Sequence, residues 1–216
     1  GSPMALNIIE AGIPLVVHDV DENKTIEHEK AGAEVLYSPM EVANASDRTI
    51  CLVETTRQVE EVICGERGII HGAKPGHIVI CMSTIDPTVA KRIASDLLLQ
   101  EILMLDAPVS GGTARAQAAD LTVIAGGEKK VFDQCKDIFE AIGKDAFYIG
   151  DHGQGLVMKL INNMLGITNT ITLIEGLTIG AKSGIGLQTM LDVFRKSSGA
   201  SAAVELRVPR IFDGDF

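Results

Sequence analysis

The sequence predicts an α/β protein, with a mostly parallel sheet covered by helices and then an all-α domain that begins with one long helix. Short apolar runs alternate with helical segments over residues 1–150, and the connections between them are short, which favours a parallel sheet. The glycine-rich stretch Gly150–Gly155 is followed by an apolar helix pattern that continues to Gly184. We therefore expect one domain over residues 1–150 and the start of a second over residues 151–216.

The first helix and strand have the pattern of a dinucleotide-binding unit. Residues 2–11 are predicted to form a helix, with Ser2 as its N-cap and Gly12 just past its end. Residues 13–19 follow as a Val-rich strand that ends on Asp19. In a Rossmann-type βαβ unit the acid at this place accepts hydrogen bonds from the adenosine ribose, so the first domain is expected to be of this type.

Strands and helices then alternate along the rest of the first domain. Further strands are expected at residues 34–37, 48–53, 77–82, 102–105, 121–125 and 146–149. Helices are expected at residues 22–31, 59–64, 86–99 and 129–142. In the second domain the long helix is followed by one at residues 187–196, and no closing helix or strand is expected over residues 208–216.

Three loops follow predicted strands at the edge of the sheet where ligands bind. They are residues 53–58, residues 83–85 with two hydroxyls, and residues 106–113. The third contains Ser110–Gly112 ahead of a predicted helix, where backbone amides could hold a carboxylate because glycine allows a close approach. The alternative for these three residues is an ordinary turn with a left-handed glycine.

The long helix carries a lysine and an amide on one face. Lys159 and Asn163 are four residues apart, so they lie one turn apart on the same side. Burying an ammonium without a carboxylate nearby lowers its pKa toward the range useful for proton transfer, which makes Lys159 the leading catalytic candidate. Two alternatives remain at this point: a solvated surface lysine, and a strand over residues 167–174, where apolar and polar residues alternate.

The composition excludes several classes of protein. Hydrophobic residues make up 46% of the 216 residues, which is ordinary for a globular chain, and the net charge of −10 argues against binding to nucleic acid or an anionic membrane. Neither a signal peptide nor a run of eighteen apolar residues is visible. Four cysteines without a CxxC pair, and scattered histidines, favour a cytoplasmic protein without a metal site.

Four segments, in this order, resemble the motifs of the β-hydroxyacid dehydrogenases, the family of 3-hydroxyisobutyrate dehydrogenase and tartronate semialdehyde (2-hydroxy-3-oxopropionate) reductase. They are Gly1-Ser2-Pro3-Met4-Ala5, Met82-Ser83-Thr84-Ile85, residues 106–112 and residues 153–163. The resemblance runs through the whole chain, and an ordered set is more specific than any one motif.

The resemblance implies a role for each matching residue. Lys159 would be the catalytic lysine and Asn163 its helical partner. The substrate carboxylate would bind Ser110, Gly111 and Gly112. The cofactor would contact Gly1, Ser2, Pro3, Met4, Asp19, Val53, Glu54, Gln58 and Thr84. The family also implies a homodimer or homotetramer formed through the all-α domain.

The implied activity is the NAD(P)-linked interconversion of a short β-hydroxy acid and its semialdehyde or keto form, with Lys159 as general acid and base. Asp19 is followed by Val20 and no arginine, which favours NAD over NADP. Alternative substrates are glyoxylate and succinic semialdehyde, or a larger acid as in 6-phosphogluconate dehydrogenase. A non-catalytic dinucleotide-binding module is the competing class.

The chain departs from the family pattern at several positions. Val53-Glu54 stands where members usually have Leu-Pro, Cys81 replaces a common Asp, and Ala119 replaces a usual turn glycine. The first strand, the first glycines of the fingerprint and the later helices have no counterpart here. We therefore expect a segment truncated at both ends that binds the cofactor poorly by itself.

Overall fold

The computed structural model of the protein describes residues 1–213, apart from the side chains of residues 207 and 209–213. The chain separates into two compact units, residues 1–159 and the residues from Leu160 onward. Each unit has a buried apolar core of its own.

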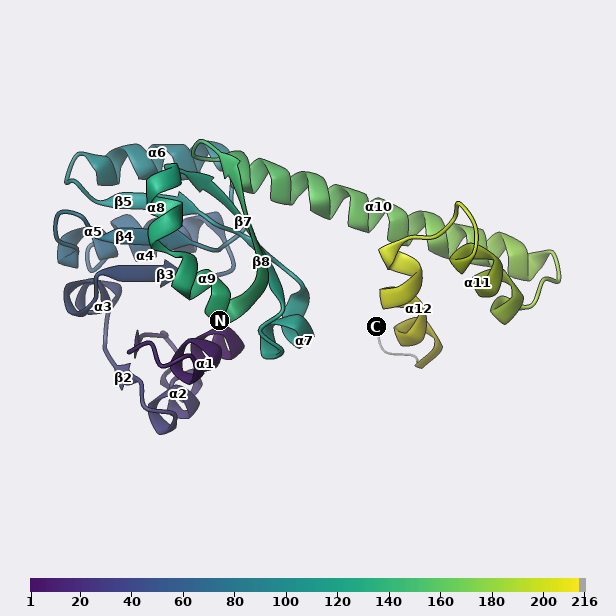
Figure 1. Ribbon diagram of the computed structural model, residues 1–216, viewed down its shortest axis with the longest axis horizontal. Coiled ribbons are helices and arrows are strands. Elements are labelled where there is room, and N and C mark those ends of the chain that lie inside the picture. Colours follow the sequence, from purple (N-terminus) through teal and green to yellow (C-terminus); the bar gives the residue numbers. More distant parts are fainter. Residues whose placement is uncertain (214–216) are drawn as a thin grey trace. The chain divides into compact units, whose positions relative to one another are not determined.

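The first unit is built on a mixed, mostly parallel sheet (Figure 1), which confirms the predicted fold class. Its strands, in spatial order, are β3 (Arg48–Cys51), β4 (Ile78–Cys81), β5 (Leu103–Asp106), β7 (Leu121–Gly127) and β6 (Val109–Ser110), with β8 (Gly143–Gly150) paired to β7. The pairs β3–β4, β4–β5 and β7–β8 are parallel. Both β5 and β6 pair antiparallel with β7, so one edge of β7 is covered by two short strands separated by Ala107 and Pro108.

Two more strands form a separate parallel sheet. β1 (Val16–Val17) pairs with β2 (Glu34–Val35), and both are shorter than the strands predicted at residues 13–19 and 34–37. Among the described residues β1 pairs with β2 alone and β3 with β4 alone. The backbones of β1 and β3 are therefore each paired along one side.

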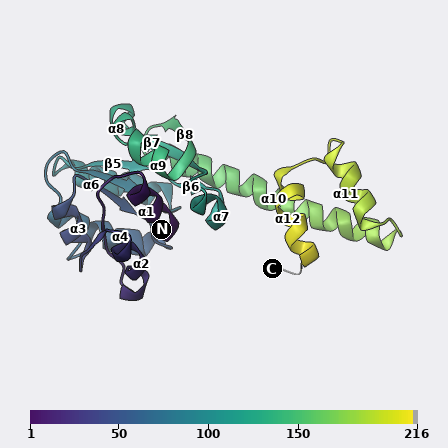
Figure 2. The same ribbon diagram turned by 60° about the horizontal axis from the view of Figure 1, so that its bottom comes forward.

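Helices cover both faces of the main sheet. The helices of this unit are α1 (Ser2–Glu10), the 3₁₀ helix η1 (Glu22–Lys24), α2 (Ile26–Lys30), α3 (Pro39–Ala45), α4 (Thr56–Cys64), α5 (Ile69–Gly72), α6 (Pro87–Leu98), α7 (Gly112–Gln117), α8 (Lys129–Gln134) and α9 (Lys136–Ile142). Of these, η1 and α2 lie beside the small sheet, where α2 contacts β2 and α1. Side chains of β4 alternate between the faces: Ile78 and Ile80 pack with α1, α8 and α9, whereas Val79 and Cys81 pack with α4 and α6. α8 and α4 accordingly lie on opposite sides of the sheet (Figure 2).

Some elements differ from the prediction. α3 was not predicted, although Ser38 accepts a hydrogen bond from the Glu41 N–H as its N-cap and Pro39 occupies its first turn. The single helix predicted over residues 129–142 is divided at Cys135, which leaves the helical region at φ −107° and ψ 7°.

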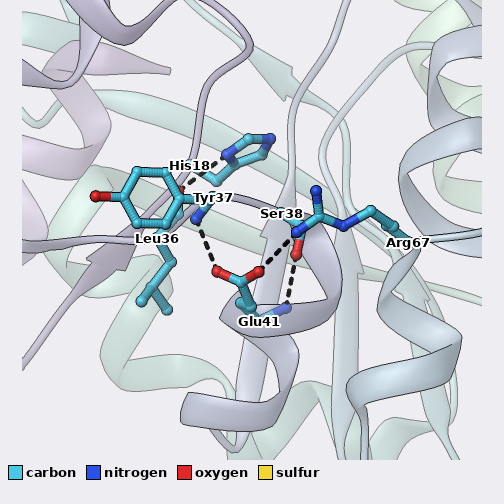
Figure 3. A network of polar contacts seen from close by, with 6 residues as sticks. All are labelled: His18, Leu36, Tyr37, Ser38, Glu41 and Arg67. Atoms are coloured by element: carbon cyan, nitrogen blue, oxygen red, sulfur yellow. Dashed lines mark hydrogen bonds and ion pairs between the residues drawn. The ribbon is translucent and has the colours of Figure 1, made fainter.

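A polar network holds the segment between β2 and α3 (Figure 3). The Glu41 carboxylate accepts hydrogen bonds from the Tyr37 N–H at 3.0 Å and from the Arg67 guanidinium at 2.7 Å. The Nδ1 atom of His18 lies 3.1 Å from the Leu36 carbonyl oxygen. His18 follows β1 directly, so these contacts fix the chain around the end of β1, where Asp19 lies.

The second unit is all helical. It contains α10 (Gln154–Lys182), which starts in the first unit, followed by α11 (Leu187–Arg195) and α12 (Ala202–Asp213). The predicted long helix is thus confirmed, and the strand alternative for residues 167–174 is wrong. The expectation of no closing helix is wrong as well, because α12 extends to Asp213; residues 214–216 lie outside the described residues. The core of this unit is formed by Leu173, Leu177, Met190, Leu191, Ala203, Val204 and Val208.

Much of the apolar surface of α10 is exposed. Ile167, Ile171 and Ile179 are 61%, 53% and 67% exposed, although the helix is rich in apolar residues. By length and composition alone α10 could cross a membrane, although the sequence contains no uninterrupted run of eighteen apolar residues. Of its most apolar window, 17% is buried. This helix therefore presents apolar side chains that neither unit covers.

Ala119 adopts a left-handed conformation at the end of α7. Its φ is +50°, and the Asp120 N–H donates to the Arg115 carbonyl oxygen at 2.8 Å, as in a helix end that normally uses glycine. We expect Ala119→Gly to raise the free energy of unfolding by about 1 kcal/mol, because glycine has no Cβ to strain this conformation. Urea denaturation would measure the change.

Ala118→Gly is the matched control, because Ala118 has a φ of −85° and gains nothing from glycine. It should lower the free energy of unfolding by roughly 0.5–1 kcal/mol. Equal effects of the two substitutions would contradict the strain assigned to Ala119.

Candidate functional site

Residues proposed for ligand binding gather at the carboxyl ends of the strands. Val53 follows β3, Thr84 follows β4 and Ser110 follows β5, and these three parallel strands end at the same edge of the sheet. Gly1 lies close both to this edge of the sheet and to Asp19, which follows β1. A Cβ built on Gly1 would lie 3.9 Å from Leu52 Cδ2, and the Asp19 carboxylate acts electrostatically on the Gly1 nitrogen.

The start of α1 differs in detail from the prediction. Its N-cap is Gly1 rather than Ser2, and no side chain caps it. The Ser2 hydroxyl lies 2.8 Å from Nε2 of the buried His28. Met4 is 4% exposed and packs in the core with Ile8, so its side chain faces away from the edge. The first turn therefore offers backbone groups, with Pro3 lacking an N–H.

The segment after β3 is held by two side chains. The Ser83 hydroxyl accepts a hydrogen bond from the Val53 N–H and donates one to the Val53 carbonyl oxygen, both at 2.8 Å. Ser83 is 2% exposed, so its hydroxyl is used inside the protein. The expectation that this hydroxyl would bind a ligand at the strand edge is therefore wrong. The Gln58 Oε1 atom accepts from the N–H groups of Glu54 and Thr55 at 3.0 and 2.9 Å. The exposed Glu54 and Thr84 remain at the surface.

The loop after β5 has a backbone conformation that requires glycine. Gly111 and Gly112 have φ values of +144° and +71°, and both are exposed. A Cβ on Gly111 would lie 2.9 Å from both Arg115 Cβ and Leu121 Cδ2. Ser110 pairs with Thr122 in the sheet, directly before these glycines. Gly112 thus has the left-handed conformation that the turn alternative also predicts, and two exposed glycines follow Ser110 directly.

Asp106 connects this loop to α10. Its carboxylate accepts hydrogen bonds from the N–H groups of Gly153 at 2.7 Å and Leu156 at 3.0 Å. Asp106 is 1% exposed; burial raises its pKa, and these two bonds lower it. The sequence motif includes Asp106 in this loop but indicates no role for it. An acid at the end of a buried strand nevertheless indicates a residue with a buried hydrogen-bonding partner.

Lys159 lies one helical turn beyond this connection. It is 8% exposed, and burial lowers the pKa of its ammonium. None of the ion pairs in the described part of the chain involves Lys159. The surface-lysine alternative is therefore wrong. Asn163 follows one turn later on α10 and is half-buried. A lysine in this state can exchange a proton with a ligand oxygen.

Metal ligands do not gather in the described residues: no group of three His, Cys, Asp or Glu side chains could hold an ion. Cys51 and Cys81 face each other across β3 and β4. Burial raises the pKa of Cys51 well above its ordinary value and that of Cys81 to about 12. These thiols are therefore poor nucleophiles. Unlike theirs, the pKa of Lys159 is shifted toward neutral pH, as proton transfer requires.

Comparison with known families and structures gives two matches that together cover nearly the whole chain. Residues 1–150 match the NAD-binding domain of 6-phosphogluconate dehydrogenase, and residues 153–216 match the NAD-binding domain of NADP-dependent 3-hydroxyisobutyrate dehydrogenase. A crystal structure of 3-hydroxyisobutyrate dehydrogenase from Salmonella typhimurium superposes with a TM-score of 0.87 at 31% identity, over 100% of this chain and 76% of that one.

Two relatives show how much of a related enzyme the chain spans. It is 34% identical to 2-(hydroxymethyl)glutarate dehydrogenase of Eubacterium barkeri, over 100% of this chain and 72% of the relative. It is 35% identical to the mitochondrial 3-hydroxyisobutyrate dehydrogenase of Mus musculus, over 92% of this chain and 59% of that enzyme. The chain thus spans less than two thirds of the mouse enzyme.

The burial of Lys159 predicts a pH-dependent stability. Because its pKa is lower in the folded than in the unfolded state, the unfolded chain binds more protons between the lowered value and 10.5. The cost of burying the ammonium is therefore fully present at neutral pH and is relieved as the pH rises through this range. We expect Lys159→Met to raise the free energy of unfolding at neutral pH, with a gain that shrinks toward pH 10.5.

Urea denaturation at both pH values would measure this gain. Lys182→Met, an exposed position at the end of the same helix, is the matched control and should change stability little. The burial cost would be contradicted if Lys159→Met did not raise the free energy of unfolding at neutral pH, or if Lys182→Met raised it equally.

Proposed function

We propose, from the premise that this chain belongs to the β-hydroxyacid dehydrogenase family, that it supplies the cofactor cleft and the catalytic lysine of an NAD(P)-dependent oxidoreductase. Its substrate is a short β-hydroxy acid, which it interconverts with the semialdehyde or keto form. Residues 1–150 are the NAD(P)-binding domain, and residues 151–216 begin the all-α domain. The observation that carries this proposal is the buried Lys159, which has a lowered pKa and forms none of the ion pairs found among the described residues.

The edge at β1 and β3 fits a dinucleotide. The first turn of α1 has no side-chain cap, and the partial positive charge of a helix start attracts a pyrophosphate. Asp19 lies near that turn and would accept hydrogen bonds from the ribose hydroxyls. Val53, Glu54 and Thr84 would line the adjoining cleft. Gln58 would contribute through atoms other than Oε1, since that atom holds the start of α4.

The mechanism assigns one task to each group. The nicotinamide supplies or accepts the hydride when it is bound. Lys159 gives a proton to the substrate oxygen during reduction and removes it during oxidation. Asn163, one turn away on the same face of α10, positions the lysine. The amides of Gly111 and Gly112, together with the Ser110 hydroxyl, hold the substrate carboxylate.

The names of the relatives suggest which acids to test. 3-Hydroxyisobutyrate and 2-(hydroxymethyl)glutarate share one unit, a hydroxymethyl group on the carbon next to a carboxylate. Reduction of tartronate semialdehyde also produces this unit. We therefore place a primary alcohol of this kind first. Glyoxylate and succinic semialdehyde, whose reduced products lack it, come second.

The assembly is a homodimer or homotetramer formed through the all-α domain. The exposed isoleucines of α10, Ile167, Ile171, Ile174 and Ile179, supply an apolar surface for a second copy. The same helix carries Lys159, Asn162 and Asn163 within two turns. A membrane-spanning helix would expose these polar groups to lipid. Together with the four free cysteines, this favours a cytoplasmic protein over a membrane one.

The lysine assignment makes a kinetic prediction. In the full-length protein, Lys159→Ala should lower kcat by about 10²- to 10⁴-fold while NAD(P)H still binds, because the proton donor is lost and the cleft at β1 and β3 is intact. Steady-state assays with NADH or NADPH against tartronate semialdehyde, methylmalonate semialdehyde, succinic semialdehyde and glyoxylate would measure it.

Lys182→Ala is the control for removing a lysine from α10 and should leave kcat unchanged. Near-normal turnover by Lys159→Ala would contradict the catalytic role. If the unmodified protein binds NADH and reduces none of the four substrates, the non-catalytic binding module becomes the better description.

Asp19 sets the cofactor preference in this proposal. A carboxylate beside the ribose repels a 2′-phosphate, so the protein should prefer NADH, and Asp19→Ser should shift the ratio of kcat/KM toward NADPH by at least about tenfold. Glu22→Gln, an exposed acid three residues further on, is the control and should leave the ratio as it was. Equal efficiency of the unmodified protein with both cofactors would overturn the assignment.

A further inference from the structure

The start of α10 is in close contact with the strands that precede the carboxylate-binding loop. A Cβ on Gly155 would lie 2.5 Å from the Ile124 carbonyl oxygen and 2.7 Å from that of Asp106. A Cβ on Gly126 would lie 2.9 Å from the Asp106 carboxylate. These distances are too short for any side chain, so the helix backbone rests directly on β5 and β7.

Asp106 fixes the rotation and height of the helix at this contact. Its two oxygens accept from different residues of α10: Oδ1 from the Gly153 N–H and Oδ2 from the Leu156 N–H. A helix start leaves such N–H groups without partners inside the helix, and here a strand side chain supplies them. One buried carboxylate therefore joins the last residue of β5 to the first turn of α10.

The two features joined in this way are the two halves of the reaction site. Ser110 lies four residues after Asp106 along the chain, and Lys159 lies three residues after Leu156 on the helix. A shift of α10 at its start would move the lysine while leaving the Ser110–Gly112 loop in place. Misplacement of a catalytic group by about 1 Å can cost a hundredfold in rate.

We infer that Asp106 is a positioning residue, which sets the Lys159 ammonium at the correct place relative to the carboxylate-binding loop by holding the first turn of α10 on β5. This inference rests on the proposed function, because it concerns the same lysine. Asp106 is 1% exposed and both its carboxylate oxygens accept from α10, so it acts through the helix.

The test is Asp106→Asn in the full-length protein. The amide keeps the shape of the side chain but turns an N–H donor toward one of the two helix N–H groups. We expect kcat to fall by about ten- to a hundredfold, with KM for the cofactor unchanged within about twofold. A purely structural role would lower the melting temperature without changing kcat per folded molecule.

Thr49→Val is the matched control. It removes the hydrogen bonds of the buried Thr49 hydroxyl, with His77 Nε2 at 2.9 Å and with Ser46 Oγ at 3.4 Å, at the amino ends of β3 and β4. It should lower the melting temperature and leave kcat as it was. A folded Asp106→Asn protein with normal kcat, or an equal loss of kcat in Thr49→Val, would overturn the inference.

Amide hydrogen exchange of the unmodified protein decides the question if Asp106→Asn does not fold. The N–H groups of Gly153 and Leu156 should exchange slowly, and fast exchange of both would overturn the inference. Lys159→Ala in the same assays separates the two proposals. Normal turnover of Lys159→Ala refutes the proposed function, whereas its loss of turnover beside a fully active Asp106→Asn refutes only the positioning role.

Discussion

The buried carboxylate of Asp106 is the interaction on which the arrangement of the reaction site depends. Burial of a single carboxylate is costly and raises the pKa of Asp106, and the two N–H bonds from α10 together with the positive helix start offset part of that cost. The same contact requires glycine at positions 126 and 155, where a Cβ would collide with the backbone or with Asp106 itself. The carboxylate and the two glycines therefore form one unit, and a change in any of them affects the others.

The cofactor edge depends on a different constraint. Gly1 at the start of α1 lies beside Leu52, which follows β3, and within the electrostatic reach of Asp19, which follows β1. Ser83 keeps both polar groups of Val53 bonded, and His18 and Glu41 hold the chain around the end of β2. These contacts use side chains that lie outside the strands themselves, so single substitutions at Ser83, His18 or Glu41 would change the chain around these strand ends.

The sequence predicts the fold class and the shared face of Lys159 and Asn163, because both depend on local periodicity. The left-handed turn at Ala119 could also be predicted, since the family uses glycine there. The hydrogen bonds of Ser83 and Asp106 could not, because their partners lie 30 and 47 to 50 residues away. α12 was missed because Pro209 lies within it, and proline inside a helix removes a backbone hydrogen bond.

Among the described residues Lys159 is buried without a carboxylate in ion-pair distance, and this state suits the proton transfer proposed for it. A carboxylate placed beside Lys159 would stabilise the ammonium and raise its pKa, which would slow the release of its proton to a substrate oxygen. Burial alone has the opposite effect and leaves the ammonium free to pair with an incoming acid. In the proposed function the substrate itself supplies the negative charge, and the glycine loop after Ser110, which follows β5, is the place proposed for that charge.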